Sequence, residues 1–152
     1  MRLDRDHYMM ALAKVAAEQT TCCKRGVGCV LADKHGYILA IAYNGVARGM
    51  PHCNEEGVVG GFRTLNNACK GWDLPAGQDS CEAVHAEQNA LLQCHSPWEI
   101  DTCYVTLSPC KPCLKLLINT SCQRIVFAQE WEDPWSKEQW LKLGRSWELL
   151  SS

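Results

Sequence analysis

Two short fragments of the chain carry residue types that bind metals and move protons. One residue separates His85 from Glu87 in the first fragment, and Cys110 and Cys113 lie three apart in the second. Each fragment is predicted to begin a helix, so the two cysteines fall on one face of a first turn. The dipole and free N–H groups of a helix start favour thiolate over thiol. We therefore expect a metal-binding site.

One imidazole from His85 and two thiolates from Cys110 and Cys113 form a ligand set that suits zinc. Three protein ligands leave a fourth position open for water, and this distinguishes a catalytic site from a structural one. Zinc lowers the pKa of its bound water from about 16 to about 7. Glu87 is close enough to take a proton from that water and to pass it to a leaving amine. The predicted chemistry is hydrolytic deamination of an aminated heterocycle.

A C-x-x-C pair between a strand and a helix is also typical of a thioredoxin-like redox site. That interpretation leaves His85 and Glu87 unexplained, and the pair lies late in the chain rather than after a first β–α unit. A purely structural zinc site lacks its fourth ligand. Metal analysis separates the alternatives, since a redox pair is free of zinc and forms a reversible disulfide.

Composition limits the class of protein. The chain has 152 residues, 47% of them apolar, and a net charge of -2, which fits one globular domain over residues 1–152. It lacks the basic excess of a general nucleic-acid or membrane-surface binder. The sequence predicts neither an apolar run of the roughly 18 residues that a membrane span needs nor a secretory signal at its start.

Eleven cysteines are present, an odd number that prevents complete pairing within the chain. Together with the expected lack of a signal peptide, this favours free thiols in a reducing cytosol, some of them metal ligands. Cys29, Cys94, Cys103 and Cys122 lie in apolar stretches and are expected to act as small buried hydrophobes.

Hydrophobic periodicity and turn residues predict an alternation of helices and strands. The expected helices are 3–19, 84–95, 110–120 and 134–143, and the expected strands are 26–32, 37–43, 102–107, 123–128 and 146–150. Residues 44–80 are long, polar and rich in glycine, which is typical of a functional or ligand-bearing loop. This alternation indicates an α/β layered domain with helices on both faces of the sheet.

The sequence resembles the deoxycytidylate (dCMP) deaminases, a family of zinc nucleobase deaminases with the pattern H-x-E…P-C-x-x-C. HAEQNALL and TLSPCKPC are similar to its two zinc motifs. Cys22-Cys23 and Val27-Gly28-Cys29-Val30 resemble the segment before its first strand, and Tyr43-Asn44-Gly45 with Arg48-Gly49 resembles its G-Y-N-G-x-P-x-G loop. The resemblance runs from about residue 5 to about residue 130, and it departs from the family at Ala42 and Ala47.

The resemblance implies an α/β fold, namely a three-layer α/β/α cytidine-deaminase-like fold around a central mixed five-stranded sheet. It implies hydrolysis of dCMP to dUMP and ammonia, with attack at C4 of the base and proton transfer by Glu87. A homohexamer, activation by dCTP with Mg²⁺ and inhibition by dTTP are implied as well. The expected compartment is the cytoplasm, or the host cytoplasm for a viral protein.

Substrate residues are expected near the zinc site. The resemblance matches Asn44 to an asparagine that holds the sugar, and it places Trp131 where the family often has a tyrosine against the nucleotide. Because the chain has six tryptophans, a packing role is the alternative for Trp131. Arg25 and Arg48 are candidates for phosphate contact, since a guanidinium fork suits phosphate oxygens; the alternative for each is an ordinary solvated surface charge. Gly45 and Gly49 would let the backbone approach a ligand or adopt positive φ. The loop that contains Gly45, Arg48 and Gly49 corresponds to the loop that holds a nucleotide effector in regulated members of the family.

A second, structural zinc is also expected, because some phage members bind one through a cysteine of the C-C pair and another after the Y-N-G loop. The matching residues are Cys22 and Cys53, with Cys81, Cys23, Cys69 and His52 as further candidate ligands. Such an ion would order the long loop. Two other deaminases share the zinc motifs, a tRNA adenosine deaminase and a cytidine deaminase. The former is expected to be basic and to lack Y-N-G.

Overall fold

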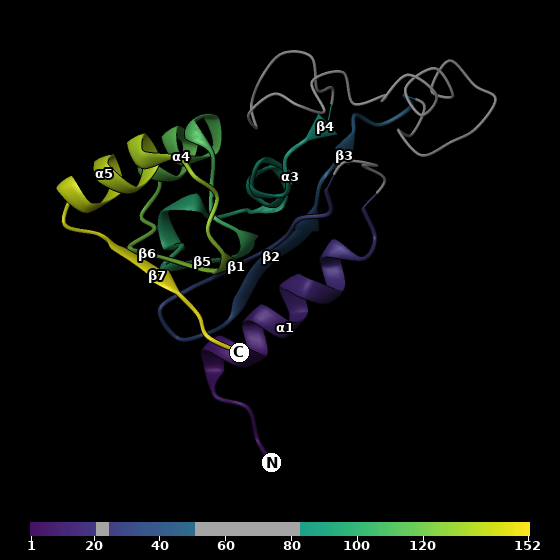
Figure 1. Ribbon diagram of the computed structural model, residues 1–152. Coiled ribbons are helices and arrows are strands. Elements are labelled where there is room, and N and C mark those ends of the chain that lie inside the picture. Colours follow the sequence, from purple (N-terminus) through teal and green to yellow (C-terminus); the bar gives the residue numbers. More distant parts are fainter. Residues whose placement is uncertain (21–24, 51–82) are drawn as a thin grey trace.

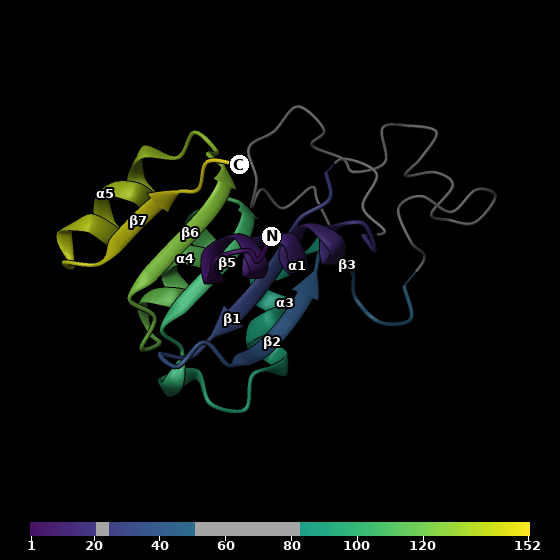
Figure 2. The ribbon, with the colours of Figure 1, turned by 90° about the horizontal axis from the view of Figure 1, so that it is seen from below.

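A mixed five-stranded sheet lies at the centre of the computed structural model, which describes residues 1–20, 25–50 and 83–152. The strands follow the order β2-β1-β5-β6-β7; β1 runs antiparallel to β2 and β5, whereas β5, β6 and β7 are parallel (Figure 2). Their bounds are β1 Gly28–Ala32, β2 Ile38–Tyr43, β5 Thr102–Leu107, β6 Arg124–Gln129 and β7 Ser146–Leu149. The predicted mixed sheet is confirmed.

Helices cover both faces of this sheet, as predicted. Helix α1 lies on one face, and helices α3, α4 and α5 lie on the other (Figure 1). Their bounds are α1 Arg5–Ala17, α3 Ala86–Gln93, α4 Lys111–Ile118 and α5 Pro134–Lys142. Helices α4 and α5 are the crossovers that parallel neighbours require. The short elements are β3 Gly45–Val46, β4 Ala83–Val84 and the 3₁₀ helix η1 Pro97–Glu99.

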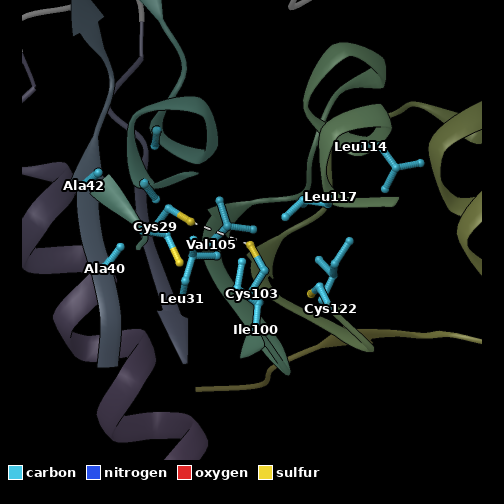
Figure 3. Packing of buried hydrophobic residues seen from close by; sticks show 14 of the residues in the cluster. Cys29, Leu31, Ala40, Ala42, Ile100, Cys103, Val105, Leu114, Leu117 and Cys122 are labelled. Carbon is cyan, nitrogen blue, oxygen red and sulfur yellow. Dashed lines mark hydrogen bonds between the residues drawn. The ribbon is translucent and has the colours of Figure 1, made fainter. Parts of the chain in front are cut away.

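The larger apolar core lies between the sheet and helices α3, α4 and α5. Buried residues of β1 and β5, among them Cys29, Leu31 and Cys103, belong to one cluster with Leu114 and Leu117 of α4 (Figure 3). The Sγ atoms of Cys29 and Cys103 are 3.6 Å apart. A hydrogen bond to Cys29, together with burial, raises the pKa of the Cys103 thiol well above its usual range.

The cysteines of the apolar stretches are buried and unpaired, as the sequence predicts. Cys29, Cys94, Cys103 and Cys122 are at most 8% exposed. They therefore fill space between the sheet and its helices as small apolar side chains.

Helix α1 lies very close to β1 on the opposite face of the sheet. A Cβ atom added to Gly28 would lie 1.8 Å from the carbonyl oxygen of Ala13. Met9 and Met10 of α1 are buried in the second core cluster, together with Tyr104. Glycine at position 28 therefore allows the helix backbone to rest directly on the strand.

One end of the sheet gathers the segments that carry chemistry. Because β5 and β6 are parallel and β1 is antiparallel to both β5 and β2, the start of β1 lies beside the ends of β2, β5 and β6. Helix α4 follows the end of β5, and β3, which follows β2, pairs with β4 just before α3. The two zinc motifs are thereby brought together.

No helix within the three described ranges is long and apolar enough to cross a bilayer. Residues 51–82, which make up most of the expected loop 44–80, lie outside the described residues; its first part contains β3.

Candidate active site

The predicted metal ligands meet in space. His85 is the N-terminal cap of α3, and Cys110 is the N-terminal cap of α4. The Nδ1 atom of His85 lies 3.3 Å from Sγ of Cys110 and 3.2 Å from Sγ of Cys113. Within the described parts of the chain, these three residues form the one group of three or more metal-ligating side chains, with ligand atoms within 4.8 Å of one another. The structure thus brings the three predicted metal ligands together.

This arrangement fits zinc. Zn–N and Zn–S bonds of about 2.0 and 2.3 Å at tetrahedral angles place nitrogen and sulfur roughly 3.5 Å apart. The observed distances of 3.2 and 3.3 Å from the imidazole of His85 are slightly shorter, so a small expansion of the triangle admits the ion. One nitrogen and two sulfurs suit zinc, and three ligands leave a fourth position free for a small molecule.

The two cysteine thiols have very different pKa values. Hydrogen bonds from Cys113 and His85 lower the pKa of the Cys110 thiol to about 5. The pKa of Cys113 is raised well above its usual range, because its thiol donates to Cys110 and because it is buried. A thiolate is therefore favoured at Cys110 before a metal binds, and a bound cation favours the second one.

Local backbone bonds hold the ligands in place. The N–H of His85 donates to Oε1 of Gln88 at 2.8 Å, and the carbonyl of His85 accepts from the N–H of Asn89 at 2.9 Å. The carbonyl of Cys110 accepts from the N–H of Leu114 at 2.9 Å. Both ligands therefore cap regular helices, which fixes the directions of their side chains.

Glu87 lies in the first turn of α3, beside the ligands but outside the ligand set. It is 4% exposed. Burial, followed by the charge of Cys110, raises the pKa of its carboxyl to about 7. A carboxyl with such a pKa gains and loses a proton at neutral pH, as a proton-transfer group requires. The structure thus places Glu87 beside the candidate ligands, and its role as a proton carrier stays a prediction.

Asn44 directly follows β2, and its side-chain amide forms hydrogen bonds within the protein. Its Oδ1 atom accepts from the N–H of Val27 and from the hydroxyl of Thr20, both at 2.8 Å. Its Nδ2 atom donates to the carbonyl of Arg25 at 2.7 Å. The side chain is 8% exposed. The expected contact between Asn44 and a sugar stays a prediction, whereas its hold on residues 25–27 is present in the structure.

Arg25 and Trp131 are brought together, although 106 positions separate them in the sequence. The guanidinium carbon of Arg25 lies 4.9 Å from the centre of the Trp131 ring. The N–H of Trp131 donates to Oγ of Ser108 at 2.7 Å. Ser108 is 3% exposed and precedes the Pro109-Cys110 pair. Sequence reasoning missed Ser108, whose position directly before the cysteine motif was the available signal.

The predicted effector residues follow β2. Gly45 is buried in β3, Arg48 is exposed, and Gly49 has a φ of 85° with open space where a Cβ atom would lie. Glycine at 49 thus allows the positive φ of a turn.

The expected ligands of the second zinc lie outside the described residues: Cys22, Cys23, His52, Cys53, Cys69 and Cys81.

A mixed sheet covered on both faces, with a His/Cys/Cys triangle at two helix starts and a buried carboxyl beside it, defines the class of zinc-dependent nucleobase deaminases. The sequence profile of the cytidine and deoxycytidylate deaminase zinc-binding region matches residues 3–129. The chain belongs to this family.

Two curated relatives are deoxycytidylate deaminases. The enzyme of Mycobacterium phage D29 is 35% identical over 131 residues, and the match covers 85% of this chain and 98% of the phage enzyme. The enzyme of Schizosaccharomyces pombe is 35% identical over 130 residues, which cover 80% of this chain. The match spans only 36% of that yeast enzyme.

A solved structure has the same fold. The dCMP deaminase of cyanophage S-TIM5, crystallised with dCMP and dUMP, superposes with a TM-score of 0.72 and 24% identity. The match covers 99% of both chains. The expected cytidine-deaminase-like fold is therefore confirmed.

Proposed function

We propose that the protein is a deoxycytidylate deaminase that hydrolyses dCMP to dUMP and ammonia. The observation that carries the proposal is the triangle of His85, Cys110 and Cys113 beside the buried carboxyl of Glu87. The match over 98% of the phage D29 enzyme supports dCMP as the substrate. We take residues 1–152 as one deaminase domain.

The side chains of the site have two functions, metal binding and proton transfer. His85, Cys110 and Cys113 would hold a zinc ion, which supplies a Lewis acid and an activated water when bound. Glu87 accepts one proton of the attacking water at its carboxylate and donates it to the ring nitrogen N3 of cytosine; it then takes the second proton of that water from the new C4 hydroxyl and passes it to the leaving amine. Water replaces ammonia at C4, and the carboxylate of Glu87 is restored. Burial of Glu87 suits this role, because it raises the pKa of the carboxyl above its usual range.

The test is Glu87→Gln in the zinc-loaded protein. The variant keeps the size of the side chain and leaves the three ligands unchanged, so we expect a full zinc content. Turnover of dCMP should fall by about 10²- to 10⁴-fold, the range of general acid–base catalysis. Glu99→Gln, an exposed carboxylate in η1, is the matched control and should retain activity. Normal turnover by Glu87→Gln would refute the proton-transfer role.

Substrate choice is tested separately. Arg25 is exposed at the same end of the sheet as the zinc ligands, and we propose that its guanidinium contacts the 5′-phosphate. We expect dCMP to be deaminated faster than cytidine or an adenosine in a tRNA anticodon stem. A preference for either of the latter two would replace dCMP as the substrate.

Regulation and assembly are finer proposals that rest on the resemblance. We propose activation by dCTP with Mg²⁺, inhibition by dTTP, an effector site that includes Gly45, Arg48 and Gly49, and a homohexamer. Saturation curves for dCMP with and without each effector test the regulation, and identical curves would remove it. Light scattering tests the oligomer.

A second zinc held by Cys22, Cys53 and Cys81 is proposed on the same basis. Metal analysis should then give two zinc ions per chain, falling to one in Cys53→Ser.

We also propose a reducing compartment, namely the cytoplasm, or the host cytoplasm if the protein is viral. The described cysteines form no disulfide, which suits such a compartment.

A further inference from the structure

Arg25 is held at two points, one on its backbone and one on its side chain. The Nδ2 atom of Asn44 donates to the backbone carbonyl of Arg25 at 2.7 Å. At its other end, the guanidinium lies 4.9 Å above the ring of Trp131. Two residues from distant parts of the chain thus determine where an otherwise exposed cation is placed.

Each holding residue is itself fixed. The Asn44 amide also accepts from Val27 and Thr20, at 2.8 Å each, so its orientation is set by three partners. The backbone N–H of Trp131 donates to the Ser108 hydroxyl at 2.7 Å, and that hydroxyl lies 3.4 Å from the carbonyl oxygen of Trp131.

Ser108 connects this arrangement to the zinc site. It lies two residues before Cys110, and it is buried. The contacts therefore form a continuous path from a zinc ligand through Ser108 and Trp131 to the guanidinium of Arg25. Such a path fixes the separation between the metal site and the cation.

We propose that Asn44 and Trp131 are positioning residues that act on the substrate through Arg25 and thereby favour a nucleoside monophosphate over a nucleoside. The proposal rests on the proposed function, since it assigns the phosphate of dCMP to Arg25. A guanidinium that is held in place before binding loses less conformational freedom when it contacts a phosphate. The ring of Trp131 and the amide of Asn44 supply that hold.

Direct contact of Asn44 and Trp131 with the nucleoside would affect the kinetic constants differently from action through Arg25. If Asn44 and Trp131 contact the sugar or the base directly, their loss impairs dCMP and deoxycytidine alike. If they act through Arg25, their loss impairs only the substrate that carries a phosphate. The ratio of kcat/KM for dCMP to kcat/KM for deoxycytidine therefore separates the two roles, because a general structural fault leaves that ratio unchanged.

The experiment compares Trp131→Leu and Asn44→Ala with the wild-type zinc-loaded protein. We expect the ratio to fall in both variants, by about three- to thirtyfold in Trp131→Leu, as the loss of a cation–π contact predicts. The change should be mainly in KM for dCMP. Trp131→Phe keeps an aromatic face and should restore most of the ratio. Trp98→Leu, which removes an exposed indole from η1, is the matched control.

The Arg25→Gln background gives the decisive comparison. Adding Trp131→Leu to Arg25→Gln should change the ratio by less than twofold, because the residue through which Trp131 acts is already lost. The inhibition constant of inorganic phosphate against dCMP turnover gives a second measurement, and it should rise in Trp131→Leu. This second measurement does not require that deoxycytidine is turned over.

An unchanged ratio and an unchanged phosphate inhibition constant in Trp131→Leu would overturn the inference. Full additivity with Arg25→Gln would overturn it as well. A wild-type protein that leaves dCMP unreacted would instead refute the proposed function. If Asn44→Ala fails to fold, Trp131→Leu and Trp131→Phe still decide the outcome.

Discussion

Replacing Glu148 by Gln should destabilise the protein at neutral pH and much less in acid. Glu148 in β7 accepts two hydrogen bonds from Arg124 of β6, from Nε at 2.8 Å and from Nη2 at 2.9 Å. Arg124 also donates to Asp6 of α1 at 3.0 Å, and Asp6 accepts from the Tyr104 hydroxyl at 2.7 Å. This network joins the N-terminal helix to the last strand.

The size of the effect follows from the carboxyl of Glu148. Hydrogen bonds from Arg124, followed by one from Ser146, lower its pKa from 4.5 to about 2. Such a change corresponds to roughly 3.4 kcal/mol. Because 37% of the side chain is exposed, water screens the pair, and we expect about 1 kcal/mol.

The sign follows from which state binds the proton more weakly. The folded state holds Glu148 as a carboxylate, so its stabilising effect is complete above the unfolded pKa of 4.5 and is lost as the pH falls towards 2. Gln cannot titrate. The stability difference between wild type and Glu148→Gln should therefore be largest at pH 7 and decline steadily below pH 5.

The assay is urea unfolding of both proteins at several values between pH 7 and pH 3. Loss of zinc in acid affects both proteins alike and cancels in the difference. Glu99→Gln, with its exposed carboxylate, provides the control and should match wild type throughout. A difference that is constant from pH 7 to pH 3 would refute the electrostatic reasoning and would point to packing alone.

Of two further predictions, one concerns the close contact between α1 and the sheet, and the other concerns removal of the metal. Gly28→Ala should cost about 1–3 kcal/mol or more in urea unfolding, because its Cβ would lie 1.8 Å from the Ala13 carbonyl oxygen. Gly49→Ala, which meets open space, should cost only the roughly 1–2 kcal/mol of its positive φ; equal costs would contradict the close contact. Dialysis against a chelator should abolish dCMP turnover and lower Tm, and added zinc should restore both. Full turnover by zinc-free protein would exclude a catalytic role for the metal.

Much of the fold could be predicted from the sequence because its elements have clear periodicity and ends. The strand over residues 102–107 is found at those bounds, and the expected helix 134–143 is found at Pro134–Lys142. A proline tolerated in the first turn marks the start of that helix. The sheet order was not predictable from local patterns, since pairing of β1 with β5 joins segments some 70 residues apart.

The residue types at 85, 87, 110 and 113, and their spacing within each motif, were enough to predict the proposed chemistry, because they supply the candidate ligands and the candidate proton carrier. The surroundings of these residues follow from the three-dimensional fold and not from local sequence. The contact between Arg25 and Trp131, the engagement of the Asn44 amide by backbone groups, and the burial that raises the pKa of Glu87 all arise between segments far apart in the chain. Local sequence patterns specify neighbours along the chain, whereas these contacts depend on which strand ends meet at one edge of the sheet.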